Sequence, residues 1–141
     1  IYLVMKKIII TLIVTFMLTS NSHTAGSSSS GSGSGSSSIS NYDKAVKLIK
    51  SAKKYEQKEK FDKAKKNYVK AQKFLIKSYN KNPNNADTLN YLGFTTRKLG
   101  DYENGEKYYL QGLAINPNHN GINEYLGELY VATNRIELAR E

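Results

Sequence analysis

The side chain with the clearest potential for chemistry is His119, which could join Glu124 or Glu128 on a metal ion. A single histidine that follows Pro117 more often caps a helix or faces solvent, and we favour that assignment. The chain has no cysteine, which excludes a disulfide framework, a thiolate zinc site and a cysteine nucleophile. Phosphate-loop, Gly-x-Ser-x-Gly and His-Glu-x-x-His motifs are absent as well. We therefore expect no catalytic residue, no metal and no cofactor.

Positive charge is concentrated in one stretch of the chain. Residues 44–81 contain 14 lysines, whereas residues 82–141 contain five basic and eight acidic residues. The net charge of +9 over 141 residues is therefore a property of the first stretch. Such a stretch can bind an acidic protein or an anionic phospholipid, but a solvated lysine-rich helix face is commoner, and we favour it. No nucleic-acid partner is expected, because no base-stacking or helix-in-groove motif is present.

The first 25 residues have the three parts of a secretory signal peptide. Lys6 and Lys7 follow Met5, the apolar stretch 8–18 comes next, and small and polar residues complete the segment. The apolar stretch is shorter than the roughly 17–25 residues that span a bilayer, which favours a cleaved signal over an anchor. We predict that residues 1–25 are a signal peptide starting at Met5 and that the protein is periplasmic or secreted. The alternative is tethering to the membrane by an uncleaved segment.

A glycine-serine segment separates the signal from the rest of the chain. Residues 26–38 contain only these two residue types, which bury no apolar area to offset the entropy of ordering. We predict that residues 26–40 are a flexible linker.

A spacing of 34 residues relates two segments of the remaining chain. A Leu-Gly pair returns at this spacing, and so does a proline. The residues at the repeated or consensus positions are Leu92, Gly93, Gly100, Tyr102, Pro117, Leu126 and Gly127. In period and pattern the chain resembles the tetratricopeptide repeat (TPR) family. The resemblance implies an all-α fold, an α-solenoid of antiparallel helix pairs that forms a TPR superhelix.

Several of these positions have a direct physical role. Gly93 removes a side chain where a partner helix approaches, and Gly100 can end one helix in the left-handed conformation while Asp101 caps the next. Tyr102 and Tyr109 are expected on the packing face of that second helix. Ser40 begins a capping box for the first helix.

Three units follow from the pattern. The first spans residues 41–85 and has a second helix that is two turns longer than that of the next unit. The second spans residues 86–119. Residues 120–141 form a partial third unit, and we expect a truncated chain because Ile136 and Leu138 would be left half covered.

The resemblance implies a binding protein, since the first helices of successive TPR units line a concave groove. Its exposed positions here would be Ile49, Lys53, Asn90, Phe94, Arg97, Lys98, Glu124 and Glu128. A central aromatic, a basic edge and an acidic far end suit an extended peptide or a partner helix. The competing interpretation is that Phe94 packs against a neighbouring helix. We predict a non-catalytic scaffold or adaptor that binds protein partners in the bacterial cell envelope. The alternative is an accessory factor, or a binder of anionic membrane surfaces through the lysine-rich first repeat.

Overall fold

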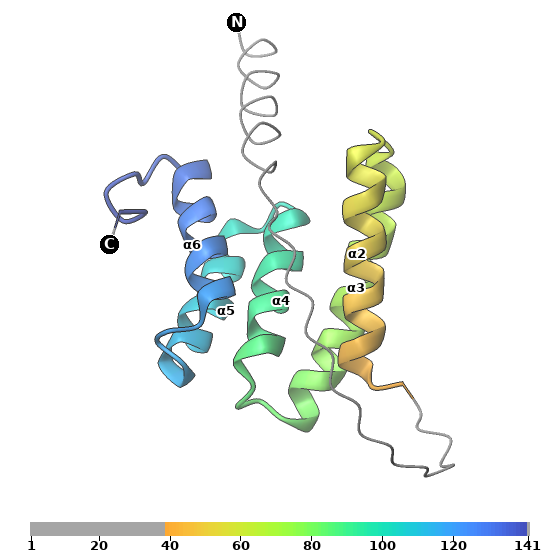
Figure 1. The fold of residues 1–141 in the computed structure, drawn as a ribbon, viewed down its shortest axis with the longest axis horizontal. Coiled ribbons are helices and arrows are strands. Elements are labelled where there is room, and N and C mark those ends of the chain that lie inside the picture. Colours follow the sequence, from red (N-terminus) through yellow and green to blue (C-terminus); the bar gives the residue numbers. More distant parts are fainter. Residues whose placement is uncertain (1–38, 141) are drawn as a thin grey trace, which may run out of the picture. The chain divides into compact units, whose positions relative to one another are not determined.

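The computed structural model describes residues 39–140; the predicted signal peptide and linker residues 26–38 lie outside the described residues. The described part contains α2 (Asn41–Gln57), α3 (Phe61–Lys81), α4 (Ala86–Lys98), α5 (Tyr102–Ile115) and α6 (Asn120–Ala132) (Figure 1). No strand occurs within these residues, which confirms the predicted all-α class. Over the same residues, no helix combines the length and the apolar character needed to cross a membrane. Turns, and no further helix, follow α6 up to residue 139.

Most of the helices begin at a residue whose side chain accepts a hydrogen bond from the first turn. Ser40 accepts from the N–H of Asp43 at 3.0 Å, which confirms the predicted cap of α2. Asp101 accepts from the N–H of Asn104 at 3.0 Å, as expected for α5, and Asn85 caps α4 in the same way. Each cap satisfies one backbone donor that the helix cannot satisfy itself.

The first helix of each unit ends in the same motif. Glu59, Gly100 and Asn134 lie just beyond α2, α4 and α6, and all three have left-handed backbones, with φ of 56°, 99° and 61°. The N–H that follows each of them returns to a carbonyl five residues earlier, at 2.9, 3.1 and 2.8 Å. This is the Schellman arrangement. The three first helices are therefore built alike, although only one of the three units has glycine at the left-handed position.

Helices that are neighbours in sequence pack side by side in pairs. α2 lies along α3 and α4 lies along α5, while α3 also contacts α4 and α5 contacts α6 (Figure 1). In α3 the buried residues are Ala64, Tyr68, Ala71 and Leu75, at the spacing of one helix face. Alanines on this face let α2 approach closely. Full burial of a larger side chain such as Leu75 contributes roughly 1.5–3 kcal/mol to the stability of the fold.

The length of α3 has a structural use. α3 has 21 residues and α5 has 14. In the last turns of α3, the Ser78 hydroxyl lies 3.3 Å from that of Thr88, and Gln111 donates to the Tyr79 hydroxyl at 2.8 Å. The added turns therefore contact both helices of the following pair.

Glycines allow α4 and α5 to pack closely. A methyl group on Gly93 would lie 2.5 Å from the ring of Tyr109, which is fully buried, so the predicted close approach is confirmed. A methyl group on Gly105 would lie 3.2 Å from the Gly93 carbonyl oxygen. At Gly127, the counterpart of Gly93, a methyl group would have no neighbour within 4 Å among the described residues. Gly127 therefore does not mark a close helix contact in the described part of the chain, where turns follow α6.

Tyr102 departs from the expected packing face of α5. It is the first residue of that helix and remains exposed, as does Phe61, the first residue of α3. Both side chains lie in the first turn of their helix and outside the two clusters of core residues. Tyr109, about two turns further along α5, supplies the buried aromatic ring instead.

Candidate functional site

Side chains from the three first helices meet in a group that we call the first-helix cluster, formed by Lys53, Phe94, Arg97, Tyr125 and Glu128. Lys53 of α2 donates a hydrogen bond from Nζ to the hydroxyl of Tyr125 of α6 at 3.0 Å. The same Nζ lies 4.7 Å from the centre of the Phe94 ring of α4. The rings of Phe94 and Tyr125 are 4.8 Å apart. The cluster therefore joins α2 to α6 across α4.

Phe94 lies inside this cluster and is only 3% exposed. Its ring also meets the Tyr68 ring of α3 edge-on at 5.8 Å. The prediction of an exposed central aromatic is therefore wrong, and the competing interpretation, packing against neighbouring helices, is confirmed. The physical reason is that aromatic rings from α3 and α6 and the ammonium of Lys53 pack around Phe94.

The predicted basic edge is neutralised within the chain. Arg97 forms an ion pair with Glu128 at 2.6 Å, in which the Arg97 side chain is 11% exposed and that of Glu128 is 50% exposed. Lys98 pairs with Glu56 of α2 at 2.8 Å. The basic edge and the acidic far end thus partly compensate each other, because Arg97 of α4 and Glu128 of α6 lie on neighbouring first helices.

The other predicted groove positions are divided between core and surface. Ile49 is buried among α2, α3 and α4, and Asn90 is buried beside the start of α6. A methyl group on Gly121 would lie 2.8 Å from the Asn90 amide nitrogen, so the two helices nearly touch there. Glu124 is exposed and forms no ion pair with another described residue. Of the predicted positions, Glu124 and Glu128 are therefore the best placed to meet a partner.

Tyrosines on the same helices were missed as candidates. Tyr42 and Tyr91 lie 5.9 Å apart between α2 and α4, and both are partly exposed, as is Tyr125. Burial raises the pKa of Tyr42 to about 12, and the negative charge of the Asp87 carboxylate contributes to this rise. Burial also raises the pKa of Tyr91, and Lys53 opposes that rise. These two phenols keep their protons at neutral pH and can donate hydrogen bonds. The spacing of Tyr91 and Tyr125, one repeat apart, could have revealed two of the three tyrosines.

His119 caps the start of α6 and lies beside Asp87. Its Nδ1 accepts a hydrogen bond from the N–H of Ile122 at 3.1 Å, and its Nε2 lies 3.0 Å from Asp87. The prediction of a capping histidine is confirmed. Within residues 39–140, no group of three histidine, aspartate or glutamate side chains could hold a metal ion.

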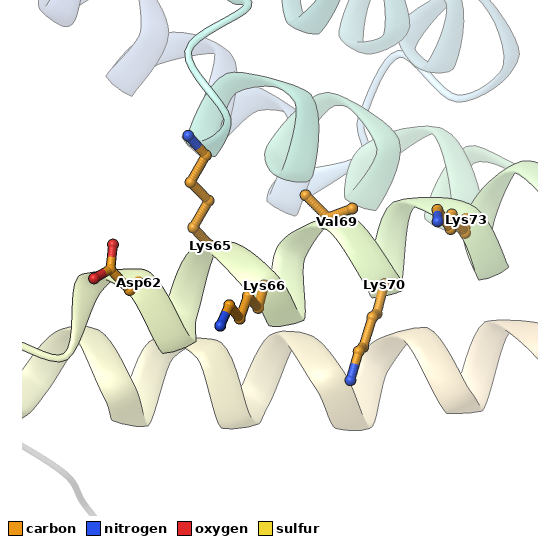
Figure 2. A pocket seen from close by; sticks show the side chains of 6 residues that line it. All are labelled: Asp62, Lys65, Lys66, Val69, Lys70 and Lys73. Atoms are coloured by element: carbon orange, nitrogen blue, oxygen red, sulfur yellow. The ribbon is translucent and has the colours of Figure 1, made fainter.

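Two hollows lie away from the first-helix cluster. One is on the outward side of α3 and is lined by Asp62, Lys65, Lys66, Val69, Lys70 and Lys73 (Figure 2). The other lies between the turn that follows α2 and the turn that follows α4. Its lining includes Glu56, Phe61, Tyr68 and Lys98. The Tyr68 hydroxyl is buried. This burial raises the pKa of Tyr68, and the negative charge of the Glu56 carboxylate raises it further.

Comparison with known families identifies the second unit. The tetratricopeptide repeat model matches residues 86–119, the segment that contains α4, α5 and the turn leading to α6. A search of curated proteins finds no match to the chain. The boundaries of this unit coincide with those expected from the 34-residue spacing.

Proposed function

We propose that this chain, which carries a tetratricopeptide repeat at residues 86–119, is a non-catalytic scaffold or adaptor whose partner binds across the first helices. Tetratricopeptide repeats are typically protein–protein interaction modules. The observation that carries the proposal is the first-helix cluster, in which the Lys53 ammonium reaches the Tyr125 hydroxyl at 3.0 Å. This contact, the Phe94 ring and the pair between Arg97 and Glu128 hold α2, α4 and α6 as one surface.

The chemistry of this surface favours a particular kind of partner. Partly exposed tyrosines offer large, rigid contact area together with hydroxyl donors, and Glu124 and Glu128 offer free or half-exposed carboxylates. The cations of the cluster are already engaged with carboxylates or aromatic rings. An extended peptide or helix with aliphatic and basic side chains fits these groups better than an acidic peptide does.

A test of this surface needs variants that leave the core intact. Phe94→Ala is unsuitable, because truncating a buried phenylalanine costs about 3–5 kcal/mol. We suggest Tyr91→Phe with Glu124→Lys, which keeps the ring that packs on the core, and as a matched control Tyr102→Phe with Glu103→Lys, two exposed positions on α5. The probe is a displayed library of short random peptides selected on the unaltered chain.

Selected peptides should be enriched in basic and aliphatic residues. They should lose at least about tenfold in affinity for the first-helix variant and keep their affinity for the α5 control. Equal binding to both variants, or selection of peptides that bind α5, would show that the partner surface lies elsewhere.

The place of action in the bacterial cell envelope is part of the proposal. It is supported by the signal-peptide pattern of residues 1–25. Full-length protein expressed in a bacterium should be recovered outside the cytoplasm and shortened by about the length of the signal peptide. Reversing Lys6 and Lys7 to glutamate should reduce export. Full-length protein retained in the cytoplasm would contradict this part while leaving peptide binding untouched.

A further inference from the structure

The outward side of α3 carries a dense group of exposed lysines. Lys65, Lys66, Lys70 and Lys73 surround Val69, and Asp62 is the acidic residue at one end of the hollow that they line. Figure 2 shows that Lys66 and Lys70 point to one side of the helix and Lys65 to the other. We call Lys65, Lys66, Val69, Lys70, Lys73 and Ile76 the α3 basic face.

The lysines of residues 44–81, which include those of the α3 basic face, differ from the later basic residues of the described chain in forming no ion pair. Among residues 39–140, every basic side chain after residue 81 forms an ion pair: Arg97, Lys98, Lys107, Arg135 and Arg140. None of the 14 lysines in residues 44–81 does so with another described residue.

The unpaired lysines also oppose the folding of their own helix. Lys66 and Lys70 stand four residues apart on α3, and Lys73 and Lys77 repeat that spacing. Like charges at this spacing destabilise a helix. The chain therefore carries a repulsion that it does not relieve internally, and an external anionic surface would relieve it.

Two aliphatic side chains are exposed within the same face. Val69 is 37% exposed and Ile76 is 43% exposed, and they stand seven residues apart, two turns along one side of the helix. Lysines around exposed aliphatic groups are typical of helices that lie in the plane of a membrane interface. The face extends over residues 65–76 of α3, which is about 18 Å along the helix.

We propose that the α3 basic face docks the protein on the surface of an anionic lipid bilayer. Lysine ammonium groups are compact point charges without the forked geometry that recognises one carboxylate, so they suit a laterally continuous charge. Val69 and Ile76 would enter the headgroup region, a contribution that a soluble polyanion cannot use. The face belongs to a second helix, so the bilayer and a partner on the first helices can be bound together.

The experiment compares the full-length chain and its variants on vesicles of phosphatidylcholine alone and of phosphatidylcholine with phosphatidylglycerol. The readout is the ratio of the two affinities, so that any contribution of residues 1–38 is common to all proteins. The test variant is Lys65→Gln, Lys66→Gln, Lys70→Gln and Lys73→Gln. The matched control, with the same loss of charge, is Lys47→Gln, Lys50→Gln, Lys54→Gln and Lys58→Gln on and just after α2; all eight lysines are exposed.

Each lysine close to an anionic membrane contributes on the order of a fivefold change in affinity. With two or three of the four in contact, the test variant should lose about 25- to 125-fold in affinity for the anionic vesicles, and the control distinctly less. Unaltered protein should also bind more weakly as salt rises. Equal losses in the two variants would mean that net charge alone drives binding, which would overturn a role for this face.

A second pair of measurements separates lipid from other polyanions. Val69→Ser with Ile76→Ser should weaken binding to anionic vesicles about three- to tenfold and leave binding to soluble polyglutamate or DNA unchanged. If the unaltered protein binds polyglutamate or DNA as tightly as vesicles, and the serine variant binds vesicles normally, the lipid proposal fails in favour of an acidic macromolecule. Circular dichroism on every variant checks that the helices are retained.

Discussion

The same substitution at two equivalent glycines should have opposite effects. Gly93 and Gly127 occupy corresponding positions of successive repeats, on α4 and α6. Replacing a helix-interior glycine by alanine contributes about 1 kcal/mol of stability through backbone entropy alone. That gain applies to both sites, so any difference between them measures the packing around the new methyl group.

At Gly93 the methyl group has no room. It would lie 2.5, 2.6 and 2.8 Å from three carbons of the Tyr109 ring, whereas carbon atoms in contact are normally about 3.5–4.0 Å apart. Tyr109 is fully buried and its ring is rigid, so α4 and α5 must move apart by about 1 Å. Overpacking of this kind costs about 1–3 kcal/mol, and the rigidity of the ring places Gly93→Ala near the upper end. The expected net effect is a loss of about 2 kcal/mol.

At Gly127 the methyl group meets no atom within 4 Å among the described residues. Gly127→Ala should therefore stabilise the protein by up to about 1 kcal/mol. For a folded unit of this size, 1 kcal/mol corresponds to about 4–8 °C in Tm. Thermal and urea unfolding followed by circular dichroism should place the two variants on opposite sides of the unaltered protein.

A double-mutant cycle tests the cause. In a Tyr109→Leu background the ring is absent, so the penalty of Gly93→Ala should shrink by at least about 1 kcal/mol. A Gly93→Ala variant as stable as the unaltered protein, or a penalty that persists without the ring, would refute the argument that contact with Tyr109 decides the effect.

Three further predictions concern stability. Gly105→Ala, which the sequence alone suggests should raise Tm, should instead lower it in thermal unfolding, because the methyl group would meet backbone atoms of α4 at 3.2 and 3.3 Å that cannot turn aside; a raised Tm would contradict this. Glu59→Gly should stabilise the protein by about 1 kcal/mol in urea unfolding, since Glu59 is held at φ 56°; the exposed control Glu103→Gly, inside α5, should destabilise it. Stability should fall as pH rises above 10. The reason is that burial raises the pKa of Tyr68 and Tyr109 above the value of 10.0 at which they ionise in the unfolded chain. Each tyrosine should lower the free energy of unfolding by about 1.4 kcal/mol per pH unit. Below pH 10 this contribution is fully present, and Tyr68→Phe should flatten the decline in melts taken at successive pH values, whereas an unchanged slope would assign it to other groups.

Local features of the fold could be read directly from the sequence. Ser40 and Asp101 cap helices, and Gly100 takes a positive φ, because each depends on a neighbouring backbone within a few residues. Gly93 was identifiable for a related reason, since the repeat pattern implied a close partner helix. The left-handed Glu59 could not be recognised in this way, because glutamate is rare in that conformation and tertiary packing must hold it there.

The candidate site was harder to predict, since its residues are arranged by contacts between distant helices. Phe94 has the spacing of an exposed groove position, but Tyr68 and Tyr125 come from two other helices to cover it. Likewise, Arg97 and Lys98 count as free cations until Glu128 and Glu56 are found beside them. Net charge and periodicity do not specify which charged side chains meet. Only the structure shows that the basic residues after residue 81 form ion pairs while the lysines of residues 44–81 do not.

The hydrogen bond from Lys53 to Tyr125 changes how this array should unfold. In a stack of helix pairs each unit normally touches only its neighbours, so the ends can fray one after another. The hydrogen bond joins residues that are 72 positions apart in sequence, so it couples α2 directly to α6 as well. Loss of α6 would then expose the aromatic surface beneath Lys53, and loss of α2 would remove the ammonium from both rings. Amide hydrogen exchange in α2 and α6 should therefore respond together, as one cooperative opening instead of two independent ones.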